Sequence, residues 1–125
     1  MPIWQHFYEI TKIPRPSKHE EQILAFLKKF AEEHNLDYAQ DKTGNIVIRK
    51  GATPGMEDRE TIILQGHIDM VCEKNSDVEH DFYKDPIKTQ ITDGWIHAEG
   101  TTLGADNGIG VAAGLAVLTD PTVEH

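Results

Sequence analysis

The stretch Leu64-Gln65-Gly66-His67-Ile68-Asp69-Met70-Val71 places an imidazole and a carboxylate directly after an apolar run. Residues 61–66 are predicted to form a buried strand, because the run is short, continuous and rich in β-branched residues. Side chains two residues apart in an extended chain point to the same face, so His67 and Asp69 would lie together. An imidazole beside a carboxylate is the usual arrangement of a metal ligand and its orienting partner. The stretch therefore indicates a metal site, with a strand end carrying two solvated polar residues as the alternative.

A second candidate residue, Asp106, lies in the glycine-rich segment 100–110, just before an apolar stretch at 111–118 that predicts a buried helix. A carboxylate in such a place can bridge two metal ions about 3.5–4 Å apart. Helix capping by Asp106 or Asn107 is the alternative. The density of glycines favours a functional site, because glycines let the backbone crowd around it.

A rival interpretation comes from the same region, because residues 108–113 fit the dinucleotide-binding pattern G-x-G-x-x-A. Two features argue against a nucleotide site. Residues 101–107 are not an apolar strand, and Asp106 would repel a pyrophosphate at the helix N-terminus. The familiar His-Glu-x-x-His and Cys-x-x-Cys zinc motifs are absent from the sequence. Cys72 has no oxyanion motif nearby, so we interpret it as a packing residue rather than a nucleophile paired with His67.

The rest of the chain predicts helices at both ends of a strand-rich middle, which indicates an α/β fold with helices covering a sheet. His6, His19 and His34 lack a ligand partner at helical spacing and are expected at the surface. The expected elements are a helix over 2–12, a helix capped by Ser17 and Glu20, strands at 37–40 and 46–49, a long loop over 72–86, and a hairpin of 90–92 and 95–98 joined by Asp93-Gly94.

Composition limits the function classes. The 125 residues suffice for one small domain, and the net charge of −9 argues against nucleic acid or an anionic membrane as the main partner. The single cysteine excludes an intrachain disulfide and suits a reducing compartment. The N-terminus lacks a signal-peptide pattern, and no apolar stretch approaches the ~20 residues of a membrane span. We therefore expect a cytoplasmic protein.

A family resemblance rests on two long stretches, Gly66-His67-Ile68-Asp69-Met70-Val71-Cys72-Glu73-Lys74-Asn75 and Ala98-Glu99-Gly100-Thr101-Thr102-Leu103-Gly104-Ala105-Asp106-Asn107-Gly108-Ile109-Gly110-Val111. Together they resemble the aminoacyl-histidine dipeptidases, also called Xaa-His dipeptidases or peptidase D, which are co-catalytic zinc exopeptidases. The likeness extends to residues 13–17 and 81–86 and so covers nearly the whole chain. It implies a three-layer αβα catalytic domain, of which residues 1–125 would be the N-terminal portion.

The resemblance also implies the roles of the site residues. His67 would be a ligand to one zinc ion, Asp106 would bridge two zinc ions, and Asp69 would be the catalytic-site carboxylate that orients His67. The implied reaction is hydrolysis of dipeptides, of the Xaa-His type, by a water activated between the metals. The full-length protein would be a homodimer.

The chain lacks several residues and a domain that belong to the family pattern. The family also uses a Glu-Glu pair as general base and ligand, a further acidic ligand, a distant histidine, and a separate lid or dimerisation domain. Glu124-His125 does not replace the Glu-Glu pair. We therefore expect the remaining ligands to lie beyond His125 and the 125-residue piece to be inactive alone. A non-catalytic metal-binding or scaffold module of the same fold stays open as the alternative.

Overall fold

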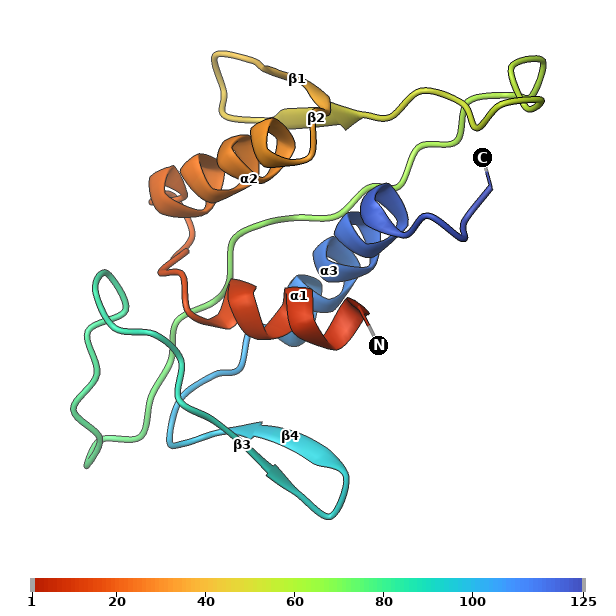
Figure 1. Ribbon diagram of the computed structural model, residues 1–125. Helices are drawn as coiled ribbons and strands as arrows, with labels where there is room; N and C mark the ends of the chain where they lie inside the picture. The colour runs from red at the N-terminus through yellow and green to blue at the C-terminus, as the bar shows by residue number, and fades with distance from the viewer. Residues whose placement is uncertain (1, 125) are drawn as a thin grey trace.

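The computed structural model describes residues 2–124. Two helices come first along the chain, two small hairpins follow, and a third helix comes last; a long extended segment lies between the hairpins (Figure 1). In order, the elements are α1 (Pro2–Thr11), α2 (Glu21–Glu33), β1 (Asp37–Gln40), β2 (Ile46–Arg49), β3 (Thr89–Thr92), β4 (Trp95–Ala98) and α3 (Ala105–Thr119).

The core is formed by the apolar faces of the three helices. α1 and α3 pack against each other in the middle of the molecule, and α2 adds a third apolar face (Figure 1). The helical spacing of the apolar residues predicted the buried face of α2, and in α1 it predicted the burial of Phe7 and Ile10, whereas Trp4 and Tyr8 are 52% and 51% exposed. No helix within residues 2–124 has the length and apolar character to cross a membrane. The buried residues of this core are Phe7, Ile10, Ile23, Leu27, Phe30, Ala112 and Leu115.

The predicted capping box at the start of α2 is wrong. The helix begins at Glu21, and its N-cap residue Glu20 makes no side-chain cap. The Ser17 hydroxyl instead donates to Oδ2 of Asp69 and, at 3.3 Å, to the carbonyl of Met70. A tertiary contact thus takes the donor that the local pattern assigned to the helix.

The predicted strands 37–40 and 46–49 and the predicted hairpin of 90–92 and 95–98 are present, and they form two separate two-stranded antiparallel sheets. β1 pairs with β2 from Asp37 opposite Arg49 to Gln40 opposite Ile46. β3 pairs with β4, and the connecting residues Asp93 and Gly94 have φ values of 52° and 80°. Two consecutive positive φ angles are the mark of a type I′ turn, whose twist suits a two-residue hairpin loop.

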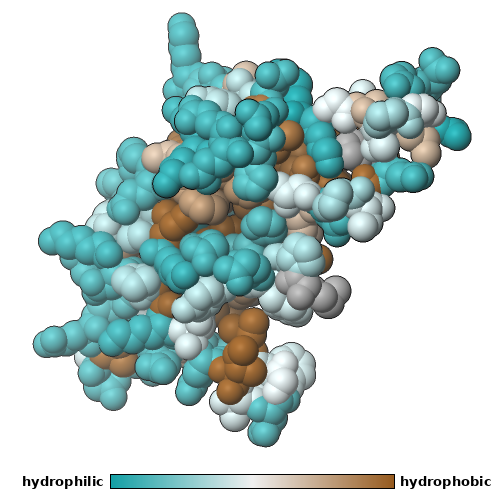
Figure 2. All heavy atoms as spheres, in the orientation of Figure 1, coloured by the Kyte–Doolittle hydropathy of each residue, from teal (hydrophilic) through white to brown (hydrophobic). Residues whose placement is uncertain are grey.

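The buried strand predicted over 61–66 is not formed within residues 2–124. This segment is extended but pairs with no described strand, and Ile62 and Ile63 are 79% and 84% exposed. Each of the two sheets consists only of the two strands of its own hairpin, so neither sheet includes residues 61–66. Apolar surface remains open between the polar side chains on the face drawn in Figure 2. The strand-like sequence is present, but a strand also needs a partner, which the described residues do not supply.

Candidate metal centre

The three predicted site residues lie together at the point where two distant segments meet. His67 Nε2 is 3.0 Å from Oδ1 of Asp106, a residue 39 positions later. On the other edge of the ring, His67 Nδ1 is 3.1 Å from Oδ1 of Asp69 and 3.2 Å from the Asp69 carbonyl. One imidazole therefore lies between two carboxylates, one on each ring nitrogen.

The two carboxylates favour positive charge on the ring. The hydrogen bond to Asp106 raises the pKa of His67 most. The contacts with Asp69 also raise this pKa, whereas desolvation of the ring lowers it. The pKa of Asp69 is lowered first by the Ser17 hydroxyl and then by His67, against desolvation. The His67 side chain is 52% exposed and that of Asp106 96% exposed, so water screens this pair. The site is open to solvent on the Asp106 side.

The backbone and hydrogen bonds at the start of α3 show which residue caps the helix. Asp106 and Asn107 have non-helical backbone angles, and the peptide bond between them is cis. The Asn107 Oδ1 atom accepts a hydrogen bond from the Gly110 amide at 3.0 Å. Asn107 therefore satisfies the helix start, which leaves the Asp106 carboxylate directed at His67.

Gly66 makes room for this arrangement. A Cβ atom at Gly66 would lie 2.9 Å from Nδ2 of Asn107, closer than side chains tolerate. The absence of a side chain lets the residue before His67 approach the residue after Asp106. Of the two uses of a glycine after an apolar run, a turn or a close approach, Gly66 serves the close approach.

The segments that carry the site residues are tied by backbone hydrogen bonds. The Met70 amide donates to the Arg15 carbonyl at 2.9 Å, and the Ser17 amide donates to the Met70 carbonyl at 3.3 Å. Further along, the Thr102 amide donates to the Glu73 carbonyl at 2.9 Å. The chain after Asp69 is thus fixed to residues 15–17 on one side and to the chain before Asp106 on the other.

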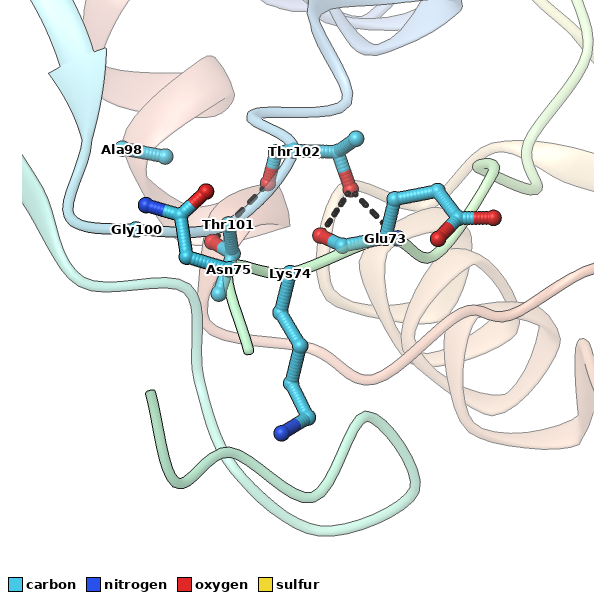
Figure 3. A pocket seen from close by; sticks show the side chains of 7 residues that line it. All are labelled: Glu73, Lys74, Asn75, Ala98, Gly100, Thr101 and Thr102. Atoms are coloured by element: carbon cyan, nitrogen blue, oxygen red, sulfur yellow. Dashed lines mark hydrogen bonds between the residues drawn. The ribbon is translucent and has the colours of Figure 1, made fainter. Parts of the chain in front are cut away.

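An open hollow of about 390 Å³ lies beside the hydrogen-bonded residues Glu73 and Thr102 (Figure 3). The Thr102 hydroxyl sits at its rim, in hydrogen-bond contact with the backbone of Glu73. None of the three predicted site residues lines it, so the hollow is separate from the candidate metal centre. Its lining residues are Glu73, Lys74, Asn75, Ala98, Gly100, Thr101 and Thr102.

Comparison with known proteins finds peptidases among the relatives of this chain. No family model matches the chain. The chain is 52% identical over 99% of its length to the cytosol non-specific dipeptidase of Escherichia coli. It superimposes on the aminoacylhistidine dipeptidase of Vibrio alginolyticus with a TM-score of 0.96 and 52% identity, over 99% of this chain.

The resemblance to the aminoacyl-histidine dipeptidases is confirmed. A tripeptidase of Staphylococcus aureus shares the fold, with a TM-score of 0.71 at 24% identity. The mixed α/β class predicted from the sequence is confirmed by the same matches. The chain covers 26% of the E. coli protein and 25% of the Vibrio chain, so it spans about a quarter of the dipeptidases it matches.

Two residues of this site were not identified from the sequence. Ser17 donates its hydroxyl to Asp69, and Arg15 donates to the backbone carbonyls of Ile68, Asp69 and Gly104. Both lie in the segment 13–17, which carries part of the resemblance. An arginine between two prolines, in a short connection between helices, was the available signal.

The rival nucleotide site lacks its structural context. Residues 108–113 lie inside α3, and no named strand leads into them within residues 2–124. Gly108 is buried, where a Cβ would meet Arg15 and Phe7 rather than a ligand. The same described range holds no group of three or more histidine, cysteine or acidic side chains arranged to bind a metal ion. His67, Asp69 and Asp106 by themselves are thus less than a complete metal site.

Proposed function

We propose that the full-length protein hydrolyses dipeptides with the help of two zinc ions, and that His67, Asp69 and Asp106 belong to the zinc site. The observation that carries the proposal is the single imidazole held between two carboxylates from segments far apart in the sequence. The 52% identity to a dipeptidase over 99% of this chain supports the reaction class.

The donor atoms fit a zinc ion. His67 Nε2 and Asp106 Oδ1 are 3.0 Å apart. Two ligands at the usual distances from a tetrahedral zinc ion lie about 3.3 Å from each other. Little movement would therefore let both atoms bind one ion, which would take the place of the hydrogen bond between them. The exposed second oxygen of Asp106 is free to reach another ion, as a bridging ligand must.

Each residue has a distinct task in this proposal. Asp69 accepts the Nδ1 proton of His67, which leaves Nε2 as the unprotonated ligand atom and holds the ring in place. Ser17 keeps Asp69 charged and in position. Asp106 would supply negative charge to both cations. When bound, zinc would lower the pKa of a water molecule toward neutrality and polarise the scissile carbonyl.

The proposed activity is tested with purified full-length protein and a panel of dipeptides that includes Xaa-His sequences. We expect hydrolysis that a chelator abolishes and added zinc restores. The E. coli relative is named non-specific and the Vibrio relative is named for aminoacylhistidine substrates, so the panel also tests our proposal of Xaa-His dipeptides. Zinc binding without turnover would instead identify a non-catalytic metal-binding module.

The cellular setting follows from the same relatives. The name of the E. coli protein places that protein in the cytosol, and we propose the same location here, in agreement with the single cysteine. We further propose that the full-length enzyme is a homodimer and that neither nucleic acid nor membrane is its partner. Light scattering coupled to gel filtration measures the oligomeric state directly.

Replacing Asp69 by asparagine in the full-length enzyme should lower turnover by about 10- to 100-fold while most zinc stays bound, because the change removes the charge that orients His67 but no direct ligand. Activity at saturating zinc and the bound metal are measured on the same sample. Asp58→Asn, in the exposed loop before the site, removes the same charge and serves as control. Unchanged turnover in Asp69→Asn would exclude Asp69 from the site.

A further inference from the structure

Arg15 is the only buried charged side chain within residues 2–124, with 1% of its surface exposed. Its guanidinium donates to the carbonyls of Ile68 and Asp69, both at 3.1 Å, and to the carbonyl of Gly104 at 2.6 Å. All three partners are neutral backbone groups. A charge is costly to bury unless it is well paired, so a role confined to packing would be served better by an apolar side chain.

The three carbonyls belong to the two segments that carry the candidate ligands. Ile68 and Asp69 directly follow His67, and Gly104 lies two residues before Asp106. The guanidinium is planar and rigid, and its donors point in fixed directions. Arg15 therefore joins the two segments through one rigid group, in addition to the backbone ties that lie further along the chain.

The surrounding glycines leave space for this guanidinium. A Cβ atom at Gly104 would lie 2.5 Å from Nη2 of Arg15, and a Cβ at Gly108 would lie 2.9 Å from the same atom. Gly104 also has a φ of 71°, a conformation that other residues rarely adopt. The backbone on both sides of Asp106 thus fits closely around Arg15.

We propose that Arg15 is a positioning residue that sets the distance and orientation of His67 relative to Asp106. The expected effect of Arg15 on zinc binding and turnover rests on the proposed function. The expected effect of Arg15 on the position of the His67 ring does not. Lysine can keep the positive charge, but it has a single point-like donor group and cannot reproduce the fork that reaches both segments. Arg15→Lys therefore separates the geometry of the guanidinium from its charge.

The first test compares three variants of the full-length protein. Arg15→Lys removes the fork. Gly108→Ala places a methyl group 2.9 Å from Nη2 and 3.1 Å from the Phe7 ring, and it leaves Arg15 in the sequence. Gly114→Ala is the matched control, because it makes the same change in the same helix at a position with no described atom within 4 Å of the new Cβ. If Arg15→Lys fails to fold, Gly108→Ala still tests whether Arg15 positions His67.

Two readouts are measured for each variant. The first is the ring-nitrogen chemical shifts of His67 in metal-free protein at fixed pH, assigned with a His67→Gln variant, which report the contacts of the ring with Asp69 and Asp106. The second is the affinity for zinc alone, by competition with a chelator. We expect Arg15→Lys and Gly108→Ala to move the His67 signals and to weaken zinc binding by about 10- to 100-fold, as changes around metal ligands typically do. Gly114→Ala should change neither.

The variant that combines Arg15→Lys with Gly108→Ala completes a double-mutant cycle. In the Arg15→Lys background, Gly108→Ala should move the His67 signals less than it does alone, because the contact of the methyl group with Nη2 is gone and only its contact with the Phe7 ring remains. Wild-type His67 signals in both single variants, or fully additive effects in the double variant, would overturn the positioning role. The His67 signals decide this inference even if the protein hydrolyses no dipeptide, a result that would count against the proposed function alone.

Discussion

Replacing Asp106 by alanine in the full-length enzyme is expected to remove at least one zinc ion and to lower turnover further than Asp69→Asn does. A bridging carboxylate contributes a ligand to both ions and screens their mutual repulsion. Asp69 cannot take its place, because its two oxygens are already engaged by His67 and Ser17. No other described carboxylate lies within hydrogen-bond reach of His67.

The same variant should leave the fold intact, which makes its effect on the metal easy to interpret. The Asp106 side chain is 96% exposed, and the helix start is capped by Asn107 rather than by Asp106. Elemental analysis after gel filtration counts the zinc, and thermal unfolding of the metal-free protein checks the fold. Asp106→Asn keeps one oxygen ligand and should lie between wild type and alanine. Two zinc ions retained at normal affinity by Asp106→Ala would contradict the bridging role.

The local elements could be predicted from the sequence because their causes are local. The turn Asp93-Gly94 adopts the positive φ angles that aspartate and glycine favour, and this sets the register of β3 and β4. α1 follows the helical spacing of its apolar residues and ends shortly before Pro14. In both cases the signal and the structure lie within the same dozen residues.

The failures involve partners that are distant in the sequence. Residues 61–66 have a strand-like composition, but a strand requires a neighbour whose identity the run does not encode. Ser17 fits a capping box, yet its hydroxyl is taken by Asp69, which lies 52 residues away. Local propensity is a weak guide where a tertiary contact competes for the same hydrogen bond.

The candidate site shows the same division. The side-by-side placement of His67 and Asp69 follows from the alternation of an extended chain, and it survives although the segment pairs with no described strand. The approach of Asp106 to His67 could not be derived from spacing and came from the family resemblance. Arg15, which contacts both segments, left no pattern in the sequence that would assign it a partner.

The 125-residue chain alone is expected not to hydrolyse dipeptides and to bind zinc weakly. A catalytic zinc ion typically has three protein ligands and a water molecule. Residues 2–124 bring His67 and a shared Asp106 to the centre, with Asp69 engaged behind the ring, and they contain no complete group of three ligands. His80 and His97 do not contact His67.

The measurement is isothermal titration of the purified chain with zinc, run beside a dipeptidase assay with the full-length protein as the positive control. The exposed apolar side chains at 62–64 favour self-association, so the chain is titrated as a monomeric fraction from gel filtration. Weak binding that His67→Gln abolishes would place the residual affinity at this centre. Two zinc ions bound at micromolar or tighter affinity, or zinc-dependent turnover, would mean that the described residues already form a working site. The assignment of further ligands to residues outside this chain would then be wrong.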